Sequence, residues 1–134
     1  MKGTCLCKQV TIEVDETHEF DACHCTKCRR WTGGPFLAIH GGKNVTITGE
    51  AFIAKYQSSE IAQRGFCRSC GTHLFYYLVA ANEYFLSIGL FQNKSDFVFK
   101  SQIFIDSKPH YYQFADVTQE LTEQQVFESY GLNI

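Results

Sequence analysis

The stretch that decides the fold reads Phe66-Cys67-Arg68-Ser69-Cys70-Gly71. Two cysteines separated by two residues and followed by a glycine are typical of a zinc knuckle, whose tight turn suits the positive φ that glycine tolerates. A second half-site, Cys5-Leu6-Cys7, lies about sixty residues earlier. Because structural zinc takes four ligands in a tetrahedron, the two half-sites predict one closed site, which can contribute on the order of 10 kcal/mol to folding. Its predicted ligands are Cys5, Cys7, Cys67 and Cys70.

Three more cysteines lie within six residues of one another, as Cys23, Cys25 and Cys28. Three protein ligands leave the fourth position of a zinc ion to water or a substrate, which is the pattern of a catalytic site. Three thiolates leave the ion with one net negative charge, so it can accept an incoming thiolate. We therefore expect two zinc ions, one structural and one open and labile, and we expect the chemistry at Cys23, Cys25 and Cys28.

Other interpretations of the cysteines stay open. Isolated buried thiols are common in cores, but here all seven occur in three tight groups. A disulfide framework is disfavoured by the odd count and the short spacings. A different grouping would leave one cysteine outside the metal sites. His24 is a further candidate ligand, although alternation along the chain directs its side chain away from Cys23 and Cys25, where it would face the substrate or support the metal ligands.

Length and charge narrow the class of protein. A chain of 134 residues is typical of one domain, so we expect a single zinc-binding domain over residues 1–134. The net charge of −2 argues against a protein that coats nucleic acid, because such domains usually carry a basic face. The amino terminus lacks the apolar core of a signal peptide, and no apolar run reaches the roughly 20 residues that span a membrane. We expect no membrane partner and a cytoplasmic location, where thiols stay reduced.

The sequence predicts a mainly β fold. Apolar and polar residues alternate in Val10-Thr11-Ile12-Glu13-Val14 with the period of a half-buried strand, and most of the twelve Phe and seven Tyr should pack in the core. The expected strands are residues 10–14, 45–48, 52–56, 74–78, 84–88 and 97–105, with the second and third paired across a short turn. A turn of helix is expected at residues 25–32, before Gly33-Gly34-Pro35. Thr122 and Gln125 predict a capping box for a short C-terminal helix through Tyr130.

Four motifs in this order resemble a known family. They are Gly3-Thr4-Cys5-Leu6-Cys7, residues 22–33 around Cys23-His24-Cys25-Thr26-Lys27-Cys28, residues 66–75 around the knuckle, and Ile103-Phe104-Ile105-Asp106-Ser107-Lys108-Pro109 followed by Tyr111-Tyr112. Over residues 3–116 the chain resembles the glutathione-dependent formaldehyde-activating enzyme (GFA) family, which also includes the centromere protein V group. One departure is Lys8, where the family usually has a glycine.

The resemblance implies an Mss4-like, zinc-stapled β-sheet fold with two zinc sites and the division of ligands given above. It also implies a carbon–sulfur lyase activity, in which glutathione and formaldehyde form S-(hydroxymethyl)glutathione. The partners would then be a small thiol such as glutathione and a small aldehyde. His24, His73 or Arg29 could stabilise a developing alkoxide, and basic side chains could clamp the carboxylates of glutathione. The candidate clamps are Lys27, Arg29, Arg30 and Arg68.

Two other functions remain open. Thiols add to free formaldehyde without help, so an enzyme would gain little beyond positioning, and a non-catalytic module that binds glutathione or a thiol adduct is a serious rival. A zinc-stabilised protein-interaction domain is the third interpretation, and it would need an exposed apolar patch with no open metal position. The three-cysteine cluster favours the enzyme, because an interaction scaffold needs no unfilled zinc.

Overall fold

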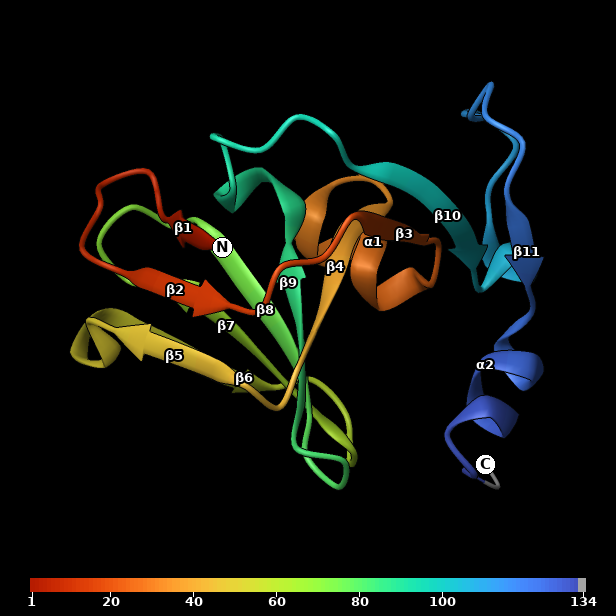
Figure 1. The fold of residues 1–134 in the computed structure, drawn as a ribbon. Coiled ribbons are helices and arrows are strands. Elements are labelled where there is room, and N and C mark those ends of the chain that lie inside the picture. Colours follow the sequence, from red (N-terminus) through yellow and green to blue (C-terminus); the bar gives the residue numbers. More distant parts are fainter. Residues whose placement is uncertain (133–134) are drawn as a thin grey trace. The chain divides into compact units, whose positions relative to one another are not determined.

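The computed structural model describes residues 1–132, which divide into two compact units. The first unit comprises Met1–His18 and Ala38–Phe97, and the second comprises Glu19–Leu37 and the chain from Val98 onward. Strands dominate the first unit, and the second combines strands with two short α-helices (Figure 1), so the expected mainly β fold with a short C-terminal helix is confirmed. The single domain expected over residues 1–134 stays a prediction.

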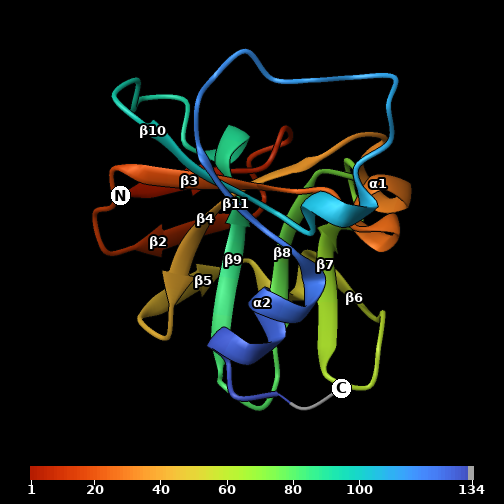
Figure 2. The ribbon, with the colours of Figure 1, turned by 90° about the vertical axis from the view of Figure 1, so that its right-hand side faces the viewer.

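The first unit holds most of the strands. They are β1 (Lys2–Thr4), β2 (Thr11–Val14), β4 (Phe36–Gly42, which begins in the second unit), β5 (Val45–Thr48), β6 (Ile53–Gln57), β7 (Ala62–Cys67), β8 (His73–Leu78) and β9 (Glu83–Ser87). The order β1-β2-β5 forms a small antiparallel sheet. The order β4-β9-β8-β7-β6 forms a larger one, also antiparallel (Figure 2).

Alternating burial explains the predicted strands of this unit. Val10, Ile12 and Val14 are buried, whereas Glu13 between them is exposed. Burying one such aliphatic side chain stabilises the fold by roughly 1.5–3 kcal/mol, so the register of β2 is strongly specified. Leu74 is buried in the same way within the predicted strand β8.

One expected strand pairing is wrong. Residues 45–48 and 53–57 are strands, but β5 pairs with β2 and β6 pairs with β7 instead of with each other. Gly49, at φ 89°, leads from β5 into the short helix η1 (Glu50–Phe52), so the chain makes no tight hairpin turn there. A Cβ atom at Gly49 would lie 2.0 Å from the carbonyl oxygen of Gln9. The two backbones therefore approach to a distance that only glycine allows.

The second unit contains a three-stranded parallel sheet. β10 (Val98–Ile103) lies between β3 (Glu19–Cys23) and β11 (Gln119–Leu121) and runs parallel to both. The sequence predicted β10 but neither of its neighbours, since β3 and β11 are short and lack a clear alternation of apolar residues. The short helix η3 (Ile105–Ser107) follows β10.

Both α-helices of the second unit lie where the sequence predicted them. α1 (Thr26–Thr32) begins after Cys25 and ends at Gly33, which adopts the left-handed conformation with φ 85°. α2 (Glu123–Ser129) begins after Thr122 with the predicted capping box. Local sequence patterns were sufficient to predict both helices, because a helix cap involves residues only three or four positions apart.

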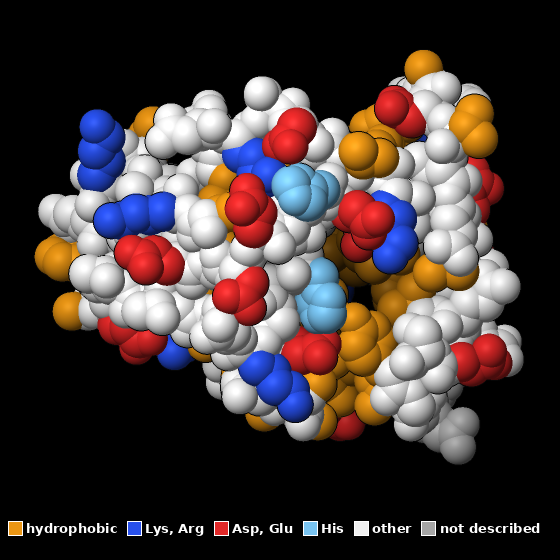
Figure 3. Space-filling model, viewed as in Figure 1, with side chains coloured by type: hydrophobic (Ala, Val, Ile, Leu, Met, Phe, Trp, Pro, Cys, Tyr) orange, Lys and Arg blue, Asp and Glu red, His pale blue; other side chains and the backbone are white. Residues whose placement is uncertain are grey.

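Two expectations from the sequence concern a basic surface patch and a membrane-spanning helix. Acidic and basic side chains are interspersed on the face drawn in Figure 3 instead of gathering into a basic patch. Within residues 1–132, no helix is both long and apolar enough to cross a bilayer. Most aromatic side chains are buried or half-buried as expected, but Tyr56 and Tyr111 are 66% and 70% exposed.

Candidate metal and active site

Four cysteines of the first unit bring their sulfur atoms together. Cys5 directly follows β1 and Cys67 ends β7, so two strands hold one ligand from each half-site. All four Sγ atoms lie within 4.8 Å of one another, and Cys7 Sγ lies 3.6 Å from Cys5 Sγ and 3.7 Å from Cys67 Sγ. Four thiolates placed tetrahedrally about 2.3 Å from zinc would be about 3.8 Å apart. The cluster of Cys5, Cys7, Cys67 and Cys70 therefore fits a closed zinc site.

Hydrogen bonds tie the two ligand loops to each other. The backbone N–H of Leu6 donates to the Thr72 hydroxyl oxygen at 3.0 Å, which joins the first loop to the second. The same hydroxyl lies 3.2 Å from Cys70 Sγ. Its hydrogen bond is the main reason that the pKa of Cys70 falls to about 5. Cys70 is therefore a thiolate at neutral pH, which is the form that binds metal.

The two loops turn in the same way. The N–H of Gly71 donates to the Cys67 carbonyl at 2.7 Å, and Gly71 has φ 78°. In the first loop, the N–H of Lys8 donates to the Cys5 carbonyl at 3.1 Å, and Lys8 has φ 66°. Lys8 thus adopts the conformation expected of the glycine that the family usually has there, at a steric cost to its Cβ.

Three cysteines of the second unit form the other cluster. Cys23 ends β3, Cys25 caps the amino terminus of α1, and Cys28 lies in the first turn of that helix. Their Sγ atoms all lie within 4.8 Å of one another. A strand that is distant in the sequence, β10, holds this cluster in place. Ile103 of β10 pairs with Cys23, and the Ile103 carbonyl accepts from the N–H of His24 at 3.1 Å.

The crowding of these sulfur atoms calls for a cation. Hydrogen bonds with the Cys25 and Cys28 thiols, followed by burial, raise the pKa of Cys23 well above its ordinary value. Three adjacent thiolates would repel one another, so a positive ion is needed to hold all three in the deprotonated form. A soft divalent cation such as zinc matches both the donor atoms and this charge requirement.

His24, which stands between Cys23 and Cys25 in the sequence, is fully buried. Its Nε2 lies 2.8 Å from Gln102 Oε1, which can only accept, so this nitrogen carries a proton and donates it. Its Nδ1 lies 2.6 Å from the Tyr112 hydroxyl and accepts a hydrogen bond from it. Burial lowers the pKa of His24, which favours the neutral ring. Both ring nitrogens are engaged with protein partners, which supports the expectation that His24 is directed away from the metal.

Arg29 stabilises the surroundings of the cluster. Its Nε donates to the His24 carbonyl at 3.0 Å, and its Nη2 donates to the Ser107 carbonyl at 3.3 Å. The guanidinium therefore links α1 to His24, two residues before the helix begins, and to η3. Its predicted contact with a substrate carboxylate stays a prediction, and two of its five donors are already used.

The other predicted substrate-binding residues are divided between the units. Lys27 and Arg30 are exposed on α1 in the second unit. Arg68 belongs to the first unit, where its Nη2 donates to the Ile53 carbonyl at 2.9 Å. His73 also belongs to the first unit, and burial followed by the nearby Arg64 charge lowers its pKa. The structure thus brings Lys27, Arg29 and Arg30 near the open cluster within one unit, and their contacts with a ligand remain predictions.

Three residues near the open cluster were not singled out as site residues by the sequence. They are Gln102, Lys108 and Tyr112, which contact His24 or one another. Lys108 and Tyr112 stand in the fourth family motif, which was the available signal. Gln102 carried no signal, because one glutamine in a strand has no distinctive spacing.

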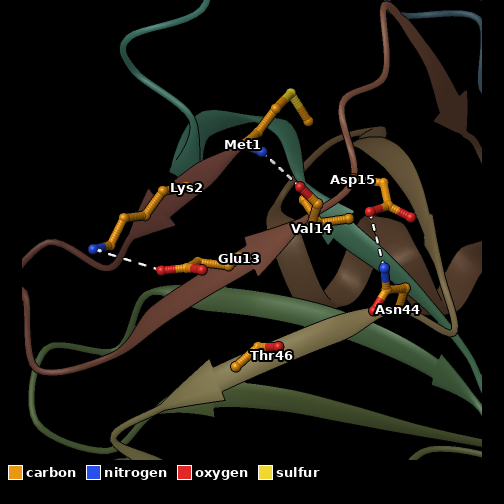
Figure 4. Close-up of a pocket in the computed structure, with 7 residues that line it drawn as sticks. All are labelled: Met1, Lys2, Glu13, Val14, Asp15, Asn44 and Thr46. Carbon is orange, nitrogen blue, oxygen red and sulfur yellow. Dashed lines mark hydrogen bonds and ion pairs between the residues drawn. The ribbon is translucent and has the colours of Figure 1, made fainter.

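A shallow depression of about 370 Å³ lies on the first unit (Figure 4). The Met1 amino group beside it donates to the Val14 carbonyl at 2.6 Å, and Lys2 pairs with Glu13 at 3.6 Å. Its polar groups contact one another, and neither a cysteine nor a histidine lines it. The depression therefore offers no chemistry comparable to that of the cysteine clusters.

Comparison with known proteins agrees with the cysteine geometry. The profile of the glutathione-dependent formaldehyde-activating enzyme family matches residues 1–107, a range that includes both cysteine clusters. The chain belongs to the GFA family. The resemblance inferred from the four motifs is thereby confirmed, although the specific reaction is a separate question.

This GFA-family chain is also similar to individual proteins. A Schizosaccharomyces pombe protein named as an uncharacterized lyase is 35% identical over 130 residues, which cover 96% of this chain and 95% of that protein. A crystal structure of a Rhodobacter sphaeroides protein superposes with a TM-score of 0.61 at 26% identity, covering 71% of this chain and 91% of that one. The sequence of the S. pombe protein and the fold of the R. sphaeroides protein are thus each matched over more than nine-tenths of their length.

Proposed function

We propose that this GFA-family chain is a zinc-dependent carbon–sulfur lyase that makes and breaks the adduct between a small thiol such as glutathione and a small aldehyde such as formaldehyde. The cluster of Cys23, Cys25 and Cys28 carries the proposal, because it gathers three thiols. Among the described residues of that unit, no fourth cysteine, histidine or carboxylate completes the set. The family profile and the lyase name of the S. pombe relative support the class of reaction.

Each cluster has a separate role in this proposal. Cys5, Cys7, Cys67 and Cys70 would hold a structural zinc ion, and Cys23, Cys25 and Cys28 would hold the second ion. A zinc ion held by three cysteines supplies a Lewis-acidic centre that lowers the pKa of a thiol at its open position. Both zinc sites require reduced cysteines, so the proposal places the protein in a compartment that keeps thiols reduced, such as the cytoplasm.

The proposed reaction breaks or forms one C–S bond and moves one hydroxyl proton. When the adduct R–S–CH₂–OH breaks, the electron pair of the C–S bond stays on sulfur, the C=O bond forms, and the hydroxyl proton is released. Addition reverses each of these changes. The surrounding residues can support the negative charge on sulfur, since Arg29 of the same unit is positively charged. Burial raises the pKa of Tyr112, so its hydroxyl keeps its proton and donates it to His24.

The decisive experiment combines metal content with kinetics. Zinc per chain would be measured in the wild type and in a variant with Cys23, Cys25 and Cys28 changed to serine, and adduct breakdown would be followed by NMR. We expect two ions to fall to one in a variant that remains folded, with loss of acceleration. One ion in both proteins after reduction and zinc loading would contradict the open site. Binding of glutathione without acceleration by the wild type would identify a binding module instead.

A further inference from the structure

The turn that follows β10 borders the open cluster. Cys25 caps α1, and Arg29, one helical turn later, donates to the carbonyl of Ser107 in η3. Figure 2 shows η3, in light blue, beside α1 in orange. Lys108 directly follows η3 and is half-buried. The connection through Arg29 therefore holds Lys108 on the side of the unit that carries the three cysteines.

Contacts with Tyr112 and Pro109, which follow Lys108 in the chain, also fix its position. Its Nζ lies 5.0 Å from the centre of the Tyr112 ring and donates to the Pro109 carbonyl at 3.0 Å. The Tyr112 hydroxyl in turn donates to His24, which lies between two of the cysteines in the sequence. An ammonium held over an aromatic ring has lost much of its freedom before any ligand arrives. Lys108 is thus a preorganised cation.

Lys108 keeps most of its hydrogen-bond donors available. Within residues 1–132, no carboxylate forms an ion pair with Lys108 or with Arg29. An ammonium group has three donors, and the Pro109 carbonyl takes one of them. Both cations also act on His24, whose pKa they lower in addition to the larger effect of burial. Two donors and a full positive charge therefore remain beside the cluster.

We propose that Lys108 binds a carboxylate of the thiol substrate, so that the site selects thiols that carry a carboxylate over neutral thiols. This inference rests on the proposed function, because it places the sulfur of that substrate at the open cluster. Glutathione carries two carboxylates and satisfies the requirement. A half-buried ammonium with two donors can form charge-assisted hydrogen bonds, which are stronger than neutral ones.

The neighbouring cations are less suited to this role. Arg29 is half-buried too and keeps three of its five donors. Its Nε and Nη2, however, are bound to the His24 and Ser107 carbonyls, so this edge of the guanidinium is not open to the two parallel bonds of a carboxylate. Lys27 and Arg30 are exposed on α1, where water screens an ion pair and leaves it worth little. Lys108 combines partial burial with remaining donors, and it is therefore the specificity-determining cation.

The test measures binding of S-methylglutathione by calorimetry to the zinc-loaded protein. This probe keeps both carboxylates of glutathione but has no free thiol, so its binding does not depend on a thiolate at the metal. We expect Lys108→Met to weaken binding about 5- to 20-fold, as for the loss of one charge-assisted hydrogen-bonded contact. Lys108→Arg should restore most of the affinity. Lys55→Met, at an exposed position of β6 in the first unit, is the matched control and should not change it.

Parallel kinetics separate this inference from the proposed function. The ratio of kcat/KM for the glutathione adduct to that for the 2-mercaptoethanol adduct should fall in Lys108→Met and recover in Lys108→Arg. Equal affinity of Lys108→Met and wild type for S-methylglutathione, or no binding by the wild type, overturns the role of Lys108 even if adducts are cleaved. Lys108-dependent binding without cleavage of either adduct supports the anion site and rejects the lyase.

Discussion

The hydroxyl of Tyr112 lies 2.6 Å from Nδ1 of the fully buried His24 and donates to it. The opposite nitrogen of the same ring donates to Gln102, whose amide nitrogen donates to the Thr118 hydroxyl oxygen at 3.1 Å. Each of these side chains therefore has a hydrogen-bond partner in the next one, and together they form a continuous line of hydrogen bonds. The line connects the residue directly after β3 with β10 and with the segment between η3 and β11, so it stabilises the surroundings of the three-cysteine cluster without using one of its cysteines.

Tyr112→Phe removes one hydrogen-bond donor and keeps the ring. Because Nδ1 of buried His24 then lacks its partner, we expect the free energy of unfolding to fall by about 1–3 kcal/mol. Urea unfolding of the zinc-saturated protein measures the effect. Tyr56→Phe is the matched control, since Tyr56 is 66% exposed, and it should change stability by less than about 0.5 kcal/mol. Equal stabilities of the two variants would contradict the importance of the His24 contact.

Gly49 and Gly33 allow a steric clash to be separated from backbone strain. Their φ values are 89° and 85°, so alanine should meet a similar conformational cost of roughly 1–2 kcal/mol at each position. At Gly49 the new Cβ would also lie 2.0 Å from Gln9 O, whereas nothing lies within 4 Å at Gly33. We expect Gly49→Ala to be clearly the more destabilising of the two in urea or thermal unfolding. Similar losses would mean that β5 can move away from Gln9.

Lys8 is the opposite case, a side chain at a position suited to glycine. With φ at 66°, Lys8→Gly should increase the free energy of unfolding by about 1 kcal/mol, because the left-handed conformation is strained for residues with a Cβ. The comparison is urea unfolding at saturating zinc. Lys55→Gly, within strand β6, should instead lower stability by roughly 0.5–1 kcal/mol. A loss of stability in Lys8→Gly would show that the lysine side chain makes a compensating contact.

The two metal sites should release their ions at different rates. Four thiolates from two cross-linked loops close the first site, whereas three thiolates leave the second accessible to competing ligands. We therefore expect two kinetic phases when a chelator is added and zinc release is followed with a colorimetric indicator. The faster phase should be absent from the variant with Cys23, Cys25 and Cys28 changed to serine. A single phase for both ions would show that the three-cysteine site is not the open one.

Local patterns predicted those parts of the protein whose determinants lie close together in sequence. The spacing of Cys67 and Cys70, the capping box at Thr122 and the alternation around Ile12 each involve neighbours within a few residues, and each has its counterpart in the structure. The pairing of β5 was mistaken, because it depends on the close approach of Gly49 to Gln9, about forty residues away. The partners of His24 were also missed, since Gln102 and Tyr112 meet it only through the parallel pairing of β3 with β10 and the turn that follows.

The same parallel pairing fixes the order in which the protein can mature. All ligands of the closed cluster have been synthesised once Cys70 is added, so that site can capture its ion while the chain is still growing. Cys23 is made earlier than Cys70, yet the strand that pairs with it begins only at Val98. The three-cysteine cluster can therefore take its final shape only after the segment that begins at Val98 has been made. In a growing chain, the four-cysteine cluster can thus form before the three-cysteine cluster has gained its supporting strand.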